Sequence, residues 1–146
     1  MGFALAALLA LAGGQEEPPS SWTVLDMDTL KTESGAALVK QADGSLLAEG
    51  AVPDKEVYTL TTSTGLREIT AFQLEALTDP SLPKSGPGRQ SSGNFVLTEF
   101  KVQAAAKAVT LKKVTADFSQ AAWHVNGTVD GKDDTGVRMD AGVYKI

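Results

Sequence analysis

EITAFQLEAL, residues 68–77, is the stretch that decides the fold. Apolar and polar side chains alternate along it, so that Phe72 and Leu74 lie on one face and Gln73 lies on the other. Alternation with period two is typical of a strand, whereas an amphipathic helix repeats its apolar residues every three or four positions. Residue propensity alone also allows a helix, but the β-branched Ile69 near the start supports the strand. We therefore predict a long strand over residues 68–77.

Shorter segments on both sides of this stretch also have strand character, and clusters of Gly, Pro, Asp and Ser separate them. Asp43-Gly44 predicts a tight hairpin, because this pair supplies the positive φ angles that a primed turn needs. No segment keeps a helical period over three turns, so the sequence predicts an all-β fold, an antiparallel β-sandwich or jelly roll. The further strands are predicted at residues 22–25, 37–40, 45–48, 57–62, 94–104 and 109–114, with one helical turn at 117–121.

A long connection follows the strand predicted at residues 68–77, with the sequence TDPSLPKSGPGRQSSG at residues 78–93. Loops of this length without regular structure are usually functional or mobile. Three prolines lie in it, and each fixes its own φ and restricts the preceding residue, which favours a defined shape. We expect Gly88 and Gly93 to be needed for positive φ angles.

The N-terminus carries an unbroken apolar run, FALAALLALA at residues 3–12. A membrane-spanning helix needs about 20 residues, but this run matches the apolar region of a secretory signal, with small residues at its end for cleavage. No Lys or Arg precedes it. The alternative is a short buried helix, which the polar QEEPPSS at residues 15–21 disfavours because it separates the run from the rest. We predict a signal peptide at 1–14, a linker at 15–21, a β-sandwich domain at 22–146, and export to the periplasm or cell exterior.

Composition excludes several classes of function. The chain has 146 residues, room for one domain, and a net charge of −5. Without a basic stripe it cannot displace counterions from nucleic acid as a binding protein does. It has no cysteine, which excludes disulfides, thiolate metal sites and covalent haem, and one histidine, which excludes a multi-histidine metal site. We predict no cofactor and no membrane span.

The long loop and its flanks carry a specific pattern: ITAFQLEAL (69–77), Asp79, SLP (81–83), GPGR (86–89) and GNFVLTEF (93–100), with Asp43-Gly44-Ser45, Gly50 and Tyr58 in agreement. This pattern resembles a domain of large secreted planctomycete-type proteins. In those proteins the domain lies beside c-type cytochrome domains and planctomycete-specific domains of unknown function. The resemblance covers roughly residues 22–136 and implies a galactose-binding-like β-sandwich, with carbohydrate binding as the expected function.

Two features depart from that family. Gln73 stands where the family usually has Arg, so any ion pair made by that Arg is absent. After Gly136 the family usually continues with Trp and a few dozen further residues, whereas this chain reads Val137-Arg138-Met139 and stops at Ile146. We therefore expect a sandwich that is incomplete at its C-terminus and that exposes an edge to other chains.

Three residues are the candidates for ligand binding: Arg89, Asn94 and Trp123. Sugar recognition uses planar donors against hydroxyl groups and an aromatic ring against the apolar sugar face. Arg89 and Asn94 flank the shaped loop, and Trp123 could be the aromatic platform. The alternative is that Arg89 ties the loop to a local carboxylate such as Asp79 and that Trp123 fills the core.

No set of residues reaches the pattern of an active site. Glu75 and Glu99 could form a glycosidase-like pair of carboxylates, but such residues more often lie on a solvated face. His124 could act as a base, although a surface or capping histidine is the commoner case. The carboxylates of Asp43, Asp130, Asp133 and Asp134 could hold calcium, but the spacing is not that of a calcium loop and a polar hairpin turn is favoured. We predict neither a catalytic nor a metal site.

The sequence thus predicts a non-catalytic accessory module of an exported protein, one that binds carbohydrate or a cell-surface polymer. The alternative is a module with no ligand of its own, which packs against neighbouring domains of a larger cytochrome-associated parent. A free-standing hydrolase ranks behind both, since no nucleophile–base set is present. An exposed aromatic ring at the loop end favours binding, whereas joint burial of Trp22, Phe95 and Trp123 favours packing.

Overall fold

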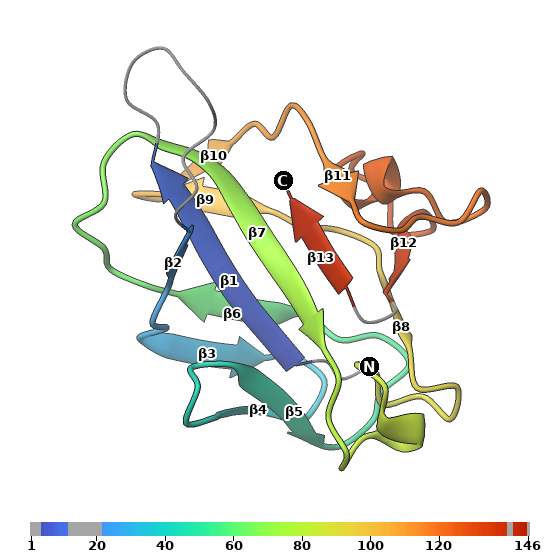
Figure 1. Ribbon diagram of the computed structural model, residues 1–146. Coiled ribbons are helices and arrows are strands. Elements are labelled where there is room, and N and C mark those ends of the chain that lie inside the picture. Colours follow the sequence, from blue (N-terminus) through green and yellow to red (C-terminus); the bar gives the residue numbers. More distant parts are fainter. Residues whose placement is uncertain (1–3, 12–21, 140–141, 146) are drawn as a thin grey trace.

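The chain folds into antiparallel strands joined by loops and two short 3-10 helices (Figure 1). The computed structural model describes residues 4–11, 22–139 and 142–145, the first and last of these ranges by their backbone. Strands make up 39% of the chain, so the prediction of an all-β fold is confirmed. The strands are β1 (Ala4–Leu11), β2 (Trp22–Val24), β3 (Thr29–Thr32), β4 (Ala36–Lys40), β5 (Leu46–Gly50), β6 (Tyr58–Thr61), β7 (Ile69–Leu77), β8 (Phe95–Leu97), β9 (Val102–Ala104), β10 (Lys107–Val109), β11 (Thr115–Ala116), β12 (Val137–Met139) and β13 (Gly142–Lys145), and the 3-10 helices are η1 (Pro83–Ser85) and η2 (Val125–Thr128).

The predicted strand at residues 68–77 is confirmed as β7, the longest strand that the structure describes. It pairs with β1 on one side and β13 on the other, within a seven-stranded sheet ordered β11-β13-β7-β1-β5-β4 in which β2 also pairs with β1. Three two-stranded sheets complete the described strands: β3 with β6, β8 with β12, and β9 with β10. The chain after Gly136, where the family pattern breaks, forms β12 and β13.

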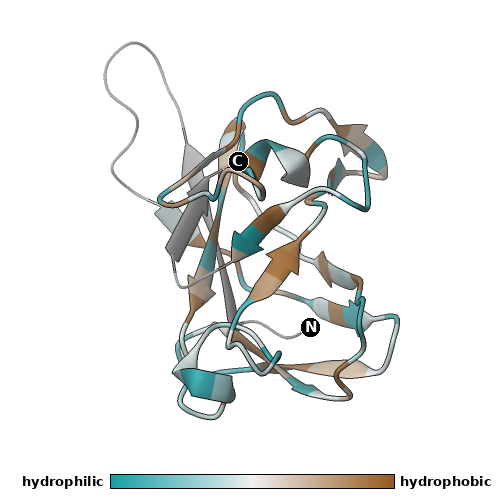
Figure 2. Cartoon of the chain, turned by 90° about the vertical axis from the view of Figure 1, so that its right-hand side faces the viewer, coloured by the Kyte–Doolittle hydropathy of each residue, from teal (hydrophilic) through white to brown (hydrophobic). Residues whose placement is uncertain are grey.

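The core is formed by residues of the large sheet together with residues of the β3–β6 and β8–β12 sheets. Leu46 of β5 and Leu74 of β7 are buried against Phe95 of β8 and against Val137 and Met139 of β12, which are completely buried. Apolar residues lie along the strands that surround this core, and the connecting loops are largely hydrophilic (Figure 2). The core therefore ties segments far apart in the sequence to β7.

The segment predicted as the apolar part of an export signal forms β1. Its backbone pairs with β7 in an antiparallel register of eight residues, from Ala4↔Leu77 to Leu11↔Ile69. It is a strand, not the short helix considered as the alternative to a signal. The linker at residues 15–21 and the cleavage position lie outside the described residues. Cleavage near residue 14 would remove β1 from its place between β7 and β5.

The predicted hairpin is confirmed as β4 and β5, but its turn is not of the primed type. Gly44 has a φ of +84°, whereas Asp43 is not among the residues with positive φ. Gly44 N donates to Gln41 O (3.0 Å), and Gln41 N donates to Ser45 O (2.8 Å). The Asp43 carboxylate accepts from the Ser45 N–H (2.9 Å), so a side-chain hydrogen bond replaces the second positive φ.

The prediction of single strands at residues 94–104 and 109–114 is wrong. The first is divided into β8 and β9, which pair with different partners, β12 and β10. Between them Phe100 N donates to Thr128 O (2.6 Å), which takes the chain out of both sheets. The second prediction is met only at Val109, the last residue of β10. Ala105 and Ala106 adopt φ angles of +49° and +64° and form the turn that joins β9 to β10.

The loop at residues 78–93 has the defined shape expected from its prolines. Backbone hydrogen bonds cross it, including Leu82 N to Asp79 O (3.1 Å) and Gly88 N to Gly93 O (2.9 Å). Gly93 has the expected positive φ of +80°, but Gly88 does not. Position 88 needs a glycine because there is no room for a side chain: a Cβ at Gly88 would lie 2.2 Å from the backbone carbonyl of Asn94.

Candidate functional site

Trp123 is presented by a tight turn in the segment between β11 and η2. Trp123 N donates to Gln120 O (3.0 Å), and Ser119 Oγ accepts from Val125 N (3.1 Å), so the turn is closed on both sides. This turn takes the place of the helical turn predicted at residues 117–121, and the 3-10 turn begins later, at Val125. The Trp123 side chain is 36% exposed and does not belong to the buried core.

Two hollows lie beside Trp123, and both Trp123 and Asp134 line both of them. The first has a volume of about 410 Å³ and is completed by a loop lysine, by Asp133 and by two residues at β8. The second has a volume of about 310 Å³ and is walled by the Trp123 turn and the loop that follows η2. The first is lined by Lys55, Val96, Thr98, Trp123, Asp133 and Asp134; the second by Ala121, Ala122, Trp123, His124, Gly127, Asp130, Asp134, Thr135 and Gly136.

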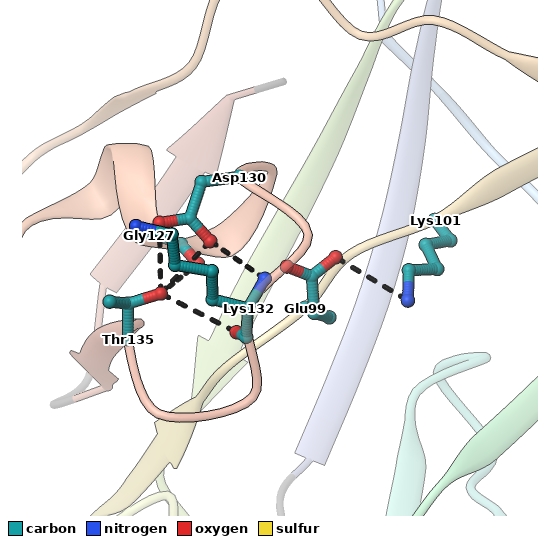
Figure 3. A network of polar contacts seen from close by, with 6 residues as sticks. All are labelled: Glu99, Lys101, Gly127, Asp130, Lys132 and Thr135. Atoms are coloured by element: carbon teal, nitrogen blue, oxygen red, sulfur yellow. Dashed lines mark hydrogen bonds and ion pairs between the residues drawn. The ribbon is translucent and has the colours of Figure 1, made fainter.

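Asp133 and Asp134 belong to the loop that follows η2, in which the side chains of Asp130 and Thr135 meet (Figure 3). The Thr135 hydroxyl lies 2.9 Å from both carboxylate oxygens of Asp130, and Lys132 N donates to Asp130 Oδ1 (3.0 Å). The loop is therefore a polar turn built around Asp130. Within the described residues, no three His, Cys, Asp or Glu side chains gather in a way that could hold a metal ion.

Lys55 belongs to the loop between β5 and β6, which Arg89 anchors at its start. Arg89 Nη1 donates to Ala51 O (2.7 Å), and Nη2 donates to Gly50 O. Ala51 N also donates to Gly35 O (3.3 Å). Because one guanidinium binds two successive carbonyl groups, it fixes the direction in which the loop leaves β5.

Glu56 anchors the other end of the same loop. Its carboxylate accepts hydrogen bonds from the N–H groups of Glu33 (2.7 Å), Ser34 (2.8 Å), Ala36 (3.1 Å) and Val57 (3.0 Å). Burial raises the pKa of Glu56, but the backbone donors outweigh it and hold the pKa below the ordinary value of 4.5. A carboxylate with a lowered pKa stabilises the fold above its ordinary pKa, and this contribution is lost as the pH falls through the lowered value.

Arg89 and Glu56 also act on the half-buried phenol of Tyr58. Burial, together with the Glu56 carboxylate, raises the pKa of Tyr58 to about 12, and the Arg89 charge opposes this rise. Tyr58 packs against the core cluster from β6. The loop that carries Lys55 is thus anchored by hydrogen bonds at both ends, from Arg89 and to Glu56, and Lys55 lines the first hollow from it.

The structure does not bring the three predicted binding residues together. Trp123 lines both hollows, whereas Arg89 and Asn94 line neither. With its amide oxygen turned toward Arg138, Asn94 accepts from Arg138 Nε (2.6 Å) and donates to Ser92 Oγ (2.8 Å). Asp79 is not the partner of Arg89, since its carboxylate accepts from Ser81 N (2.8 Å). The charged residues that line the first hollow with Trp123 are Lys55, Asp133 and Asp134. Of these, the sequence analysis singled out only the two aspartates, and it considered them as calcium ligands.

The residues considered for catalysis have separate surroundings. Glu75 accepts from Gln73 Nε2 (2.7 Å) on β7, and Glu99 lies 3.6 Å from Lys101 Nζ. Among the described residues no hydrogen bond or ion pair joins the two glutamates. His124 Nδ1 accepts from Asn126 N (3.2 Å) and caps η2, which agrees with the capping alternative.

We expect Arg89→Ala to lower the melting temperature and to leave ligand affinity per folded molecule unchanged. The change removes two charge-assisted hydrogen bonds to the carbonyl groups of Gly50 and Ala51. An exposed bond of this kind contributes about 1 kcal/mol, so a loss of about 2 kcal/mol is expected. Thermal unfolding followed by circular dichroism measures it, with Arg67→Ala as the control. A fall in affinity at unchanged stability would place Arg89 in the binding site instead.

Searches with the sequence and the structure add no relative: no family model, no curated protein and no solved structure matches the chain. No helix in the described part of the chain is long and apolar enough to cross a membrane.

Proposed function

We propose that this chain is a non-catalytic carbohydrate-binding module and that Trp123 is the platform on which the sugar ring lies. The observation that carries the proposal is the position of Trp123, which is 36% exposed and lines two hollows, whereas Phe95 is 4% exposed and belongs to the core. An exposed aromatic ring is what a binding module needs, whereas the packing alternative expects Trp22, Phe95 and Trp123 to be buried together.

The lining of the hollows supports a ligand with both apolar and polar faces. An indole contributes a flat apolar surface to the axial C–H face of a sugar. The carboxylates of Asp133 and Asp134 accept hydrogen bonds from hydroxyl groups, and the Lys55 ammonium donates them. The lining of the first hollow comes from four separate segments: the Lys55 loop, the residues at β8, the Trp123 turn and the Asp133–Asp134 loop. All but the residues at β8 are held by hydrogen bonds described above.

The proposal extends to the setting of the domain. The all-β fold and the resemblance in residues 69–77 and 86–100 support a galactose-binding-like β-sandwich of jelly-roll type. The apolar run at residues 3–12 supports export, in which case the module serves a larger secreted protein and docks it to a saccharide or cell-surface polymer. A packing module without a ligand is the alternative that the binding experiment decides.

We expect Trp123→Ala to weaken polysaccharide binding by about tenfold to a hundredfold. Burying a large apolar side chain contributes ~1.5–3 kcal/mol, which corresponds to that range of affinity. Affinity electrophoresis against neutral, amine-bearing and acidic polysaccharides measures the loss. Phe118→Ala is the matched control, because Phe118 is 54% exposed but lines neither hollow. If the wild-type chain is retarded by no polysaccharide, or if both variants bind as the wild type does, the proposal is wrong.

A further inference from the structure

We infer that the saccharide taken by the Trp123 site carries free amino groups, as a polymer of glucosamine does. This inference rests on the proposed function and adds the chemical class of the ligand. It follows from three features of the hollows: their charge, the unpaired state of two carboxylates, and the indole that lines both hollows.

The charge of the two linings is negative. They contain the carboxylates of Asp130, Asp133 and Asp134 and one ammonium, that of Lys55, and the second hollow contains no Lys or Arg. Lys132 belongs to the same loop as the aspartates but lines neither hollow. Even with Lys132 included, the carboxylates outnumber the cations, so an acidic sugar would meet net repulsion.

Asp133 and Asp134 are exposed, and within the described residues neither carboxylate takes part in a hydrogen bond or an ion pair. The neighbouring Asp130 differs, because Thr135 and Lys132 occupy its carboxylate (Figure 3). The pair is therefore free to accept charged hydrogen bonds from a ligand. An ionised carboxylate only accepts, so its best partner is a cationic donor.

The indole adds a second attraction for the same group. A cation within about 6 Å of an indole centre is attracted by the negative face of the ring. Trp123 lines both hollows together with Asp134, so an ammonium bound to this carboxylate inside either hollow shares that hollow with the indole. A sugar with an amino group presents an apolar C–H face and an ammonium at once, which matches the indole and the aspartates.

The test compares two ligands that differ only at nitrogen: the tetramer of glucosamine and the neutral tetramer of N-acetylglucosamine. We expect the full wild-type chain to bind the amine form about tenfold more tightly in isothermal titration at mildly acidic pH and physiological salt. The double variant Asp133→Asn with Asp134→Asn should bring the ratio close to one while the neutral tetramer still binds. A tetramer of galacturonic acid should bind more weakly than either.

The control for overall charge is the double variant Glu33→Gln with Glu49→Gln, which removes the same two charges at exposed positions outside both hollows. It should keep the tenfold preference, and all variants should keep the wild-type circular dichroism spectrum. Equal or tighter binding of the neutral tetramer, lost in Trp123→Ala, would overturn the amine preference and leave the proposed function intact. If the control variant also loses the tenfold preference, the assignment of that preference to Asp133 and Asp134 is overturned too. Absence of all saccharide binding would overturn both.

Discussion

Leu9→Pro is expected to lower the free energy of unfolding of the intact chain by about 3 kcal/mol, or roughly 10 °C in melting temperature. Leu9 lies in β1, where its backbone is paired with Phe72 of β7 on one side and Thr23 of β2 on the other. Proline has no N–H and is excluded from the middle of a sheet, so one ladder hydrogen bond is lost and the strand cannot stay in register. Denaturant unfolding measures the change.

Leu9→Val is the matched control, since it keeps the N–H and a residue type that favours strands. Intact mass must show that residues 1–14 are present, because a chain cleaved after export no longer contains the altered residue. A mature N-terminus between Gly13 and Glu16 would instead establish processing. If the uncleaved Leu9→Pro chain unfolds at the same denaturant concentration as Leu9→Val, β1 contributes nothing to the sheet and its placement is wrong.

Gly88→Ala is the second large effect, an expected loss of about 3 kcal/mol. A Cβ at Gly88 would lie 2.2 Å from the carbonyl carbon and oxygen of Asn94, and these are backbone atoms that no rotamer change can move. The hydrogen bond from Gly88 N to Gly93 O (2.9 Å) holds the two segments together at this point. The methyl group therefore forces apart the end of the loop that carries Arg89.

Gly65→Ala is the control for the loss of glycine itself. A Cβ at Gly65 would meet nothing within 4 Å, and its φ lies outside the left-handed region. Such a change reduces the entropy of the unfolded chain and stabilises by about 0.4–1 kcal/mol. Thermal unfolding of both variants should therefore move in opposite directions. Equal stability of the two variants would show that the close approach at Gly88 does not occur in solution.

Local pattern sufficed wherever one segment decided its own conformation. The alternation in residues 68–77 predicted β7, and Asp43-Gly44 predicted the β4–β5 hairpin, although the Asp43 side chain gave the turn a different form. The local sequence pattern failed in residues 94–104, where apolar residues on both faces indicated one long strand. Those residues face two different partners in turn, β12 and β10, and the chain changes direction between them.

The binding candidates divide in the same way. Trp123 was recognisable from its residue type alone, because an aromatic ring among small and polar residues is a candidate platform. Arg89 has the right chemistry for a ligand, but its guanidinium is occupied by the carbonyl groups of Gly50 and Ala51, which are far away in the sequence. Lys55 lies in an ordinary polar loop and gave no signal at all.

The sequence by itself determined the all-β class, the long central strand and the shaped loop, and its lack of cysteine excludes cysteine chemistry in this chain. These depend on period, composition and charge, which are properties of neighbouring residues. Only the tertiary structure decided which strands pair, which glycine is needed for space, and that Lys55 and Asp133 lie beside Trp123. The strand pairs and the approach of Lys55 to Trp123 join residues far apart in the sequence, and they accompany the burial of Leu74, Phe95 and Met139 in one core, which no local pattern encodes.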